Sequence, residues 1–361
     1  MDIFYSIGVA QVLFSLVLIG KKRELILADK VLMVMIASFG AELVYSWLNF
    51  VYIPSLPNIV MFPYLYGPLL YIYALLMTSE KPRLNKQIYL HFVPFVVFVA
   101  MAVFLGKHIY LLKIPVSKTA DDSWFQAINF IGFMVSLVYY LIKISKLMKR
   151  HRHNVLEKFS VDSESLNLSW INYLTFFVFG GFIVFITIDA ISTLTGFFLF
   201  ESAIPLHIGI LIATYSLSFF GFKQEAIFEE QQFTRYESEP AEQEIPVKPK
   251  GEKESLIQYL SEKKPYLIRN LTLQDVANEM SIPTYRLSEL INNDLGKNFF
   301  TLINELRVEE AKQRIRSGKY NHLTLSAIGF DSGFNSKSTF QALFKKYAGV
   351  TPSQYKKVNS Q

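Results

Sequence analysis

Seven long apolar runs constrain this chain more than any other feature of its sequence. The segments between them are short and polar or contain glycine or proline, and the runs cover residues 3–20, 31–53, 58–78, 88–106, 124–142, 170–195 and 204–222. A bilayer core about 30 Å thick needs about 20 mainly apolar residues per helix. Only 18% of the residues are charged, against roughly 25% in ordinary soluble proteins. The pattern therefore predicts seven transmembrane helices rather than a large soluble helical protein.

The positive charges between the runs predict their orientation, because cytoplasmic loops carry an excess of Lys and Arg. Fourteen cations follow the first, third, fifth and seventh runs, and three lie on the other side. We therefore expect a multi-pass protein with its N-terminus outside and its C-terminal region in the cytoplasm. The first run is expected to be retained rather than cleaved, because its cations follow the apolar stretch and no cleavage site is evident.

The composition changes near residue 223, which predicts three segments. Residues 1–223 form the membrane domain. Residues 224–250 hold seven acidic and three basic residues and three prolines, which is typical of a linker. Residues 251–361 hold 16 basic and 11 acidic residues and form a separate basic domain.

The basic domain begins with a pattern typical of a helix, a tight turn and a second helix, over residues 271–291. Thr272 is expected to cap the first helix, with Asp275 in the capping-box position. Pro283 suits the first turn of the second helix, where a missing N–H costs nothing. The apolar side chains of the first helix recur at helical spacing, at Leu273, Val276, Ala277 and Met280.

The same pattern returns 52 residues later, with Thr324 in the place of Thr272. Gly333 supplies a turn that other residues disfavour, and Asn335 or Ser336 can cap the following helix. Between the two copies, residues 300–316 are predicted to form one connecting helix. The fold class expected is all-α: a seven-transmembrane-helix bundle followed by a cytoplasmic domain of two helix-turn-helix units joined by that helix.

Residues 253–357 resemble the DNA-binding domain of AraC/XylS-type bacterial transcription regulators. The motifs that carry this resemblance are Gly333-Phe-Asn-Ser-Lys-Ser-Thr-Phe340, Phe344-Lys-Lys346 and Gly349-Val-Thr-Pro352, with Arg307 and Ala311 in the connecting helix. The whole chain is similar to the membrane-bound branch of that family, in which seven helices precede this module. The resemblance implies double-stranded DNA as partner, a homodimer, and a place in the bacterial inner (cytoplasmic) membrane.

The resemblance also implies that the second helix of each pair enters the major groove, where an exposed polar face beside an apolar stripe can contact base edges. The base-contacting candidates are Thr284, Tyr285, Ser288 and Glu289 in the first pair, and Lys337, Ser338 and Gln341 in the second, with Ser336 on the same face. The candidates for phosphate contacts are Arg286, Lys345, Lys346, Lys356 and Lys357.

Ionisable residues within apolar spans are costly and are therefore candidates for a functional site. Glu42 lies in the second run, and Asp189 and His207 lie in the outer parts of the sixth and seventh. All three would hold helices together as structural polar groups or serve an unknown signal ligand. Asp189 and His207 lie at similar depth, so they would pair or line an outward-opening cavity with Tyr45, Tyr64 and Tyr66.

No catalytic motif, metal-ligand pattern or cysteine occurs, so we expect neither an enzyme nor a bound cofactor or metal. The sequence favours a membrane-embedded transcription regulator whose helical domain senses a signal. Two alternatives remain open. In the first, the membrane domain stores the regulator until proteolysis releases it. In the second, the chain is a transporter or permease with a regulatory DNA-binding tail.

Overall fold

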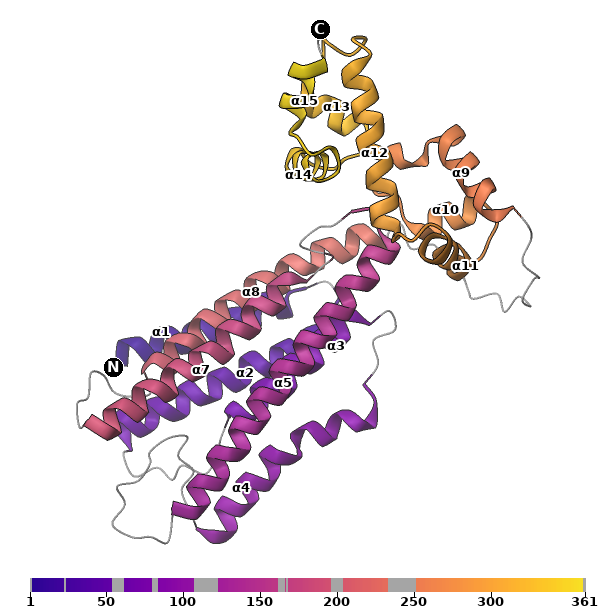
Figure 1. The fold of residues 1–361 in the computed structure, drawn as a ribbon. Coiled ribbons are helices and arrows are strands. Elements are labelled where there is room, and N and C mark those ends of the chain that lie inside the picture. Colours follow the sequence, from indigo (N-terminus) through magenta and orange to yellow (C-terminus); the bar gives the residue numbers. More distant parts are fainter. Residues whose placement is uncertain are drawn as a thin grey trace. The chain divides into compact units, whose positions relative to one another are not determined.

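Helices form almost all of the structure, a computed structural model that describes residues 2–22, 24–53, 62–79, 84–106, 123–161, 166, 168–195, 204–232 and 251–359 (Figure 1). Within these residues no strand occurs, and extended pairing is limited to one antiparallel bridge between Phe159 and Thr272. The predicted all-α class is confirmed.

The chain divides into two compact units. The first comprises Met1–Lys149 and Leu168–Glu237, and the second comprises Arg150–Asn167 and Ser238–Gln361. The second unit therefore includes a segment that the sequence analysis assigns to the membrane domain. Helix α8 continues to Gln232, into the stretch predicted as a linker, and residues 233–250 of that stretch lie outside the described residues.

The first unit is built from antiparallel neighbours and one long helix, α5 (Ser123–Lys158). Helix α1 packs against α2 and α8, α2 also packs against α3, and α7 packs against α8. The remaining helices of this unit are α1 (Asp2–Gly20), α2 (Leu27–Trp47), η1 (Leu48–Tyr52), α3 (Pro63–Thr78), η2 (Lys86–Phe92), α4 (Val93–Leu105), α7 (Ser169–Thr195) and α8 (Ile204–Gln232).

Five helical stretches among the described residues are long and apolar enough to cross a membrane: Asp2–Gly20, Lys86–Leu105, Ala127–Lys158, Ser169–Ile188 and Leu206–Lys223. They correspond to five of the seven predicted spans. The other two are α2, which contains Asp29, Lys30 and Glu42, and α3. Helix α3 has 16 residues, about 24 Å at 1.5 Å per residue, which is shorter than a bilayer core. The count of seven therefore stays a prediction.

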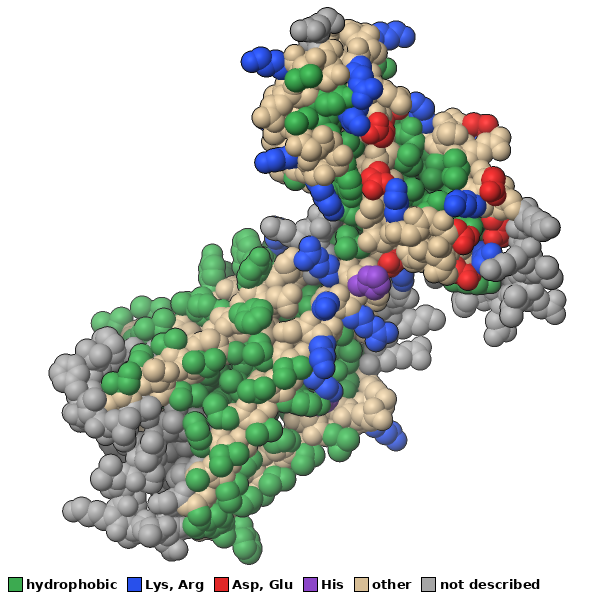
Figure 2. Space-filling view, viewed as in Figure 1, with side chains coloured by type: hydrophobic (Ala, Val, Ile, Leu, Met, Phe, Trp, Pro, Cys, Tyr) green, Lys and Arg blue, Asp and Glu red, His purple; other side chains and the backbone are tan. Residues whose placement is uncertain are grey.

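Apolar side chains cover the outside of the first unit. The exposed fractions are 89% for Phe104, 77% for Ile3 and 75% for Tyr173, whereas Thr214 and Asn129 are buried. Figure 2 shows hydrophobic side chains spread across the visible face of these helices. Soluble monomers rarely expose apolar patches larger than a few hundred Å². This distribution suits a lipid environment rather than water.

The second unit contains the two predicted helix-turn-helix pairs. The first pair is α10 (Leu273–Glu279) with α11 (Thr284–Glu289), and the second is α13 (Leu325–Asp331) with α14 (Lys337–Ala348). Helix α12 (Phe299–Arg316) joins them, one residue longer than predicted. The unit also contains α9 (Glu252–Lys263), η3 (Pro265–Leu267), η4 (Leu290–Asp294) and α15 (Pro352–Asn359).

Helix α12 contributes to two separate hydrophobic cores. Ile303 belongs to a core formed with α9, α10 and α11, whereas Val308 and Ala311 belong to a core formed with α13 and α14. All three side chains are almost completely buried. Each pair therefore packs on its own stretch of α12, as the apolar spacing of this helix predicts.

The local signals at the helix ends are confirmed. The Thr272 side chain accepts from Asp275 N–H, and Asp275 in turn accepts from Thr272 N–H, which forms a capping box at α10. Thr324 caps α13, and Ser336 caps α14 by accepting from Thr339 N–H. Helix α11 starts at Thr284 without a side-chain cap, and Pro283 is its N-cap residue, one position before the predicted first turn.

Gly333 is required at the turn between α13 and α14 for two reasons. Its φ of +94° lies in the left-handed region. A Cβ added there would lie 2.3 Å from the Tyr266 carbonyl oxygen and 2.9 Å from Arg307 Nε. We expect Gly333→Ala to lower the free energy of unfolding of the second unit by about 3 kcal/mol.

Pulse proteolysis of the full-length protein in increasing urea measures this loss. Gly318→Ala is the matched control, because Gly318 also has a positive φ (+66°) but its added Cβ would meet nothing nearer than Asn321 Nδ2 at 3.8 Å. The control is expected to cost about 1 kcal/mol. Equal losses for the two variants would contradict the packing role of Gly333.

Candidate functional sites

The exposed face of α11 carries the base-contacting candidates of the first pair. Leu287 turns inward and is completely buried, whereas Tyr285 is 61% exposed. Thr284 Oγ1 donates to Gln274 Oε1 of α10 at 2.6 Å, so the two helices of the pair are joined by a polar contact next to this face. Ser288 accepts from Asn292 Nδ2 at 3.3 Å.

Arg286 is engaged within the protein. Its Nε lies 3.0 Å and its Nη2 2.9 Å from Glu252 Oε2 of α9, and its Nη1 is paired with Glu289. Hydrogen bonds with Glu252 and then Glu289 raise the pKa of Arg286 above its usual value. A phosphate contact by Arg286 would compete with these two carboxylates, which sequence reasoning did not anticipate.

Helix α14 presents a clear division between its two faces. Phe340, Leu343 and Phe344 are buried in the core of the second pair. The exposed face carries the candidates Lys337, Ser338, Gln341, Lys345 and Lys346, beside the N-cap Ser336. Within the described residues Lys337, Gln341 and Lys345 form no side-chain hydrogen bond or ion pair, so their polar groups are available to a partner.

In the first unit, the Tyr66 hydroxyl of α3 donates a hydrogen bond to Glu42 Oε2 of α2, and both residues are buried. His207 of α8 is also buried, and its Nδ1 lies 3.2 Å from the hydroxyl of Tyr5 in α1. Glu42 and His207 therefore each connect two helices. The side chain of Asp189 lies outside the described residues.

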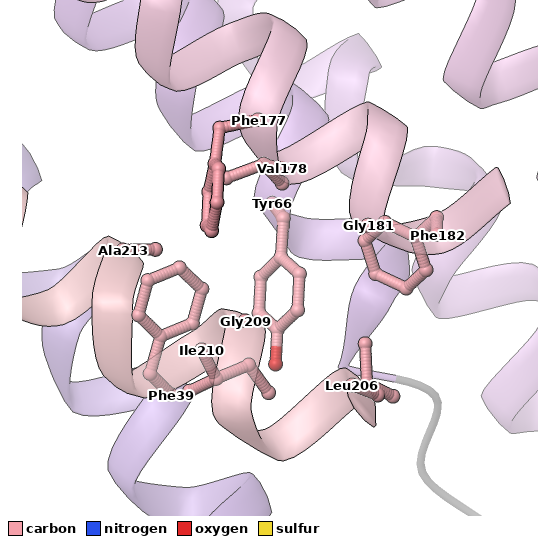
Figure 3. Close-up of a pocket in the computed structure, with 10 residues that line it drawn as sticks. All are labelled: Phe39, Tyr66, Phe177, Val178, Gly181, Phe182, Leu206, Gly209, Ile210 and Ala213. Atoms are coloured by element: carbon pink, nitrogen blue, oxygen red, sulfur yellow. The ribbon is translucent and has the colours of Figure 1, made fainter. Parts of the chain in front are cut away.

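A pocket that is partly open to its surroundings lies beside Tyr66 (Figure 3). Its lining is apolar apart from the hydroxyl of Tyr66 and comes from α2, α3, α7 and α8: Phe39, Tyr66, Phe177, Val178, Gly181, Phe182, Leu206, Gly209, Ile210 and Ala213. A Cβ added at Gly181 or Gly209 would meet nothing within 4 Å. Of Glu42 and His207, the predicted sensing residues whose side chains the structure describes, Glu42 is linked to this cavity through its hydrogen bond with Tyr66.

The C-terminal region is similar to known regulators. A family described as "Helix-turn-helix domain" matches residues 276–357. Residues 276–357 are a helix-turn-helix domain.

Two curated relatives each match about a quarter of this chain. An uncharacterized HTH-type transcriptional regulator of Staphylococcus aureus (strain COL) is 29% identical over 87 residues, which cover 24% of this chain and 11% of that protein. The raffinose operon transcriptional regulatory protein RafR of Pediococcus pentosaceus is 28% identical over 86 residues, which cover 24% of this chain and 30% of that protein. The chain thus spans less than a third of either relative. These similarities support an AraC-type regulator.

Among solved structures, the C-terminal domain of AraT, a response regulator from Geobacillus stearothermophilus, is 29% identical, with a TM-score of 0.26. It covers 29% of this chain and 84% of that one. A Listeria innocua protein of unknown function is 24% identical with the same TM-score, over 29% of this chain and 95% of its own.

We expect Lys337→Ala with Gln341→Ala to weaken discrimination among DNA sequences, because these exposed side chains are the predicted base contacts of α14. The loss is expected to be about 1–3 kcal/mol per contact, or roughly 5- to 150-fold. Lys356→Ala with Lys357→Ala should instead weaken binding to all sequences and reduce its salt dependence. Binding titrations on matched and mismatched DNA, at several salt concentrations, compare the two variants. A uniform loss from both pairs would contradict the assignment.

Proposed function

We propose that this protein is a membrane-embedded, sequence-specific transcription regulator. The observation that carries the proposal is the presence, in one chain, of a helix-turn-helix domain with an exposed polar face on α14 and a unit whose outer surface is apolar. The polar face suits the major groove, and the apolar surface suits lipid. The partners are double-stranded DNA and the lipid bilayer.

The proposed topology has seven spans, with the N-terminus outside and the helix-turn-helix domain in the cytoplasm of a bacterial cell. The five long apolar helices and the distribution of Lys and Arg between the runs support it. A domain that acts on chromosomal DNA has to lie on the cytoplasmic side. Binding as a homodimer to repeated sites completes the proposal.

We further propose that the first unit senses a signal through the cavity beside Tyr66. The cavity is lined by helices from distant parts of the chain, so a molecule bound between them would change their packing. Its apolar lining favours a hydrophobic ligand, and the hydroxyl of Tyr66 offers a single polar contact beside Glu42.

Genome-wide mapping of the DNA occupied by the tagged full-length protein tests the regulatory function. We expect occupancy at a limited set of promoters that share a repeated motif, lost in the Lys337→Ala, Gln341→Ala variant. Fractionation of the same cells reports where the protein resides. A tag beyond residue 361 that is accessible from the cell exterior would overturn the proposal, and a soluble fragment carrying residues 251–361 would favour proteolytic release.

Filling the cavity tests the sensing function. We expect Gly181→Leu to change transcription from the occupied promoters by at least about 5-fold, the lower end of typical allosteric coupling. Gly180→Leu is the matched control, since Gly180 is the preceding residue of α7, also has open space at its Cβ, and does not line the cavity. The same transcript levels in both variants would remove the cavity from the mechanism.

A further inference from the structure

The end of α5 belongs to the same compact unit as the helix-turn-helix domain. Residues Arg150–Asn167 group with Ser238–Gln361, whereas the earlier residues of the same uninterrupted helix group with the first unit. The contacts of the described stretch Leu156–Ser160, called the Ser160 segment below, account for this.

Ser160 is the anchor of this segment and is 1% exposed. Its N–H and its hydroxyl both donate to the Leu271 carbonyl oxygen, at 3.2 and 2.7 Å. Its own carbonyl oxygen accepts from Asn304 Nδ2 at 2.9 Å and from Arg307 Nη1 at 3.2 Å, and its Oγ accepts from Arg307 Nη2 at 3.2 Å. Every polar group of Ser160 is therefore bonded to the DNA-binding part of the chain.

The partner Arg307 is equally buried and needs these acceptors. Its Nε donates to the Tyr266 carbonyl oxygen at 2.7 Å, and its Nη2 donates to the carbonyls of Ile268 and Arg269 at 2.7 and 3.0 Å. Burial lowers the pKa of Arg307 to about 10. Without Ser160, Nη1 would keep only Asn304 Oδ1 at 3.4 Å, and a buried donor that loses its acceptor is unfavourable.

The Ser160 segment touches both helix-turn-helix pairs. Glu157 accepts from Asn292 Nδ2 at 2.6 Å, just beyond α11, and Phe159 pairs with Thr272 at the start of α10. Leu156 packs instead against the core of the second pair. The Ser160 segment thus contacts both pairs. Arg307 lies between α12 residues of the first core and α12 residues of the second.

From these contacts we propose that the Ser160 segment sets the orientation of the two helix-turn-helix pairs relative to each other, and thereby selects the spacing of the DNA sites that they bind together. This inference rests on the proposed function. The Ser160 segment lies at the end of α5. A movement of α5 would therefore disturb the contact between Ser160 and Arg307, and this disturbance would change the affinity for DNA. The first unit would then act on the DNA-binding domain through α5 as well as through the 224–250 stretch.

A disulfide measures the docking directly, since the chain contains no cysteine. Residues paired across antiparallel strands have Cβ atoms about 4.5–5.5 Å apart, close to disulfide distance. Phe159→Cys with Thr272→Cys, in full-length protein carrying a protease site within residues 233–250, should keep the two fragments joined after oxidation and cleavage. Each single-cysteine variant should give two separate fragments on a non-reducing denaturing gel, where hydrogen bonds no longer hold them together. Release in the double variant as well would overturn the docking.

Selection of binding sites from a random DNA library by full-length protein in lipid nanodiscs tests the consequence. We expect Ser160→Leu, which cannot enter the buried site, to lower affinity for the preferred spacing by at least about 5-fold and to accept other spacings. Asn154→Leu, at an exposed position of α5, should behave as the unmodified protein. The oxidised double-cysteine variant should keep the original spacing preference.

An unchanged spacing preference in Ser160→Leu would overturn the inference while leaving the proposed function intact. If Ser160→Leu fails to fold, Ser160→Ala takes its place. The alanine variant loses the side-chain hydrogen bonds to Leu271 and Arg307 but keeps the backbone hydrogen bonds of residue 160. An unchanged spacing preference in Ser160→Ala would also overturn the inference. The proposed function fails separately, if the unmodified protein selects no sequence at all.

Discussion

The buried guanidinium of Arg307 is the interaction on which the arrangement of the second unit depends. Moving a cationic side chain out of water costs several kcal/mol unless its donors are matched. Arg307 forms no ion pair within the described residues, and its acceptors are backbone carbonyls, the hydroxyl of Ser160 and Asn304 Oδ1. Apart from Asn304 Oδ1, these acceptors come from the segment after α9 and from the end of α5, so both segments help to hold α12 in place alongside its two hydrophobic cores. The missing side chain of Gly333 leaves the room that this arrangement needs.

Local spacing predicts the second unit well, because caps and apolar stripes depend on neighbours three or four residues away. Thr272 with Asp275, and α12 with its two buried faces, were all predictable in this way. The contact between Ser160 and Arg307 was not, since its partners are 147 positions apart and a serine in a loop gives no signal. For the same reason the pairing of His207 with Tyr5 was not predicted, whereas the polar character of His207 within an apolar run was a sufficient signal to single it out.

Close approach of small residues explains how the first unit packs and where it leaves space. Between helices in lipid there is little hydrophobic driving force, so van der Waals packing at small side chains matters more. A Cβ at Gly40 would lie 2.7 Å from Val12, one at Gly67 2.6 Å from Tyr140, and one at Gly221 2.5 Å from Leu32. These glycines therefore fix neighbouring helices against one another. A Cβ at Gly181 or Gly209 would have no such close neighbour, and both glycines line the cavity beside Tyr66.

The two pairs differ in charge, and this difference assigns them different parts in DNA binding. Glu252 of α9 and Glu289 already neutralise Arg286 of the first pair, whereas the cations on the exposed face of α14 form no ion pair with any acid among the residues that the structure describes. Attraction to phosphate is mainly a matter of unpaired cations, so the second pair is expected to supply most of the sequence-independent affinity. In the proposed complex, binding of the second pair would let α12 hold the first pair close to the same duplex, which would raise the effective concentration of the first pair there without any further contact. A weakly charged first pair can then contribute chiefly to specificity, and its contribution depends on how firmly the contacts around Arg307 hold α12.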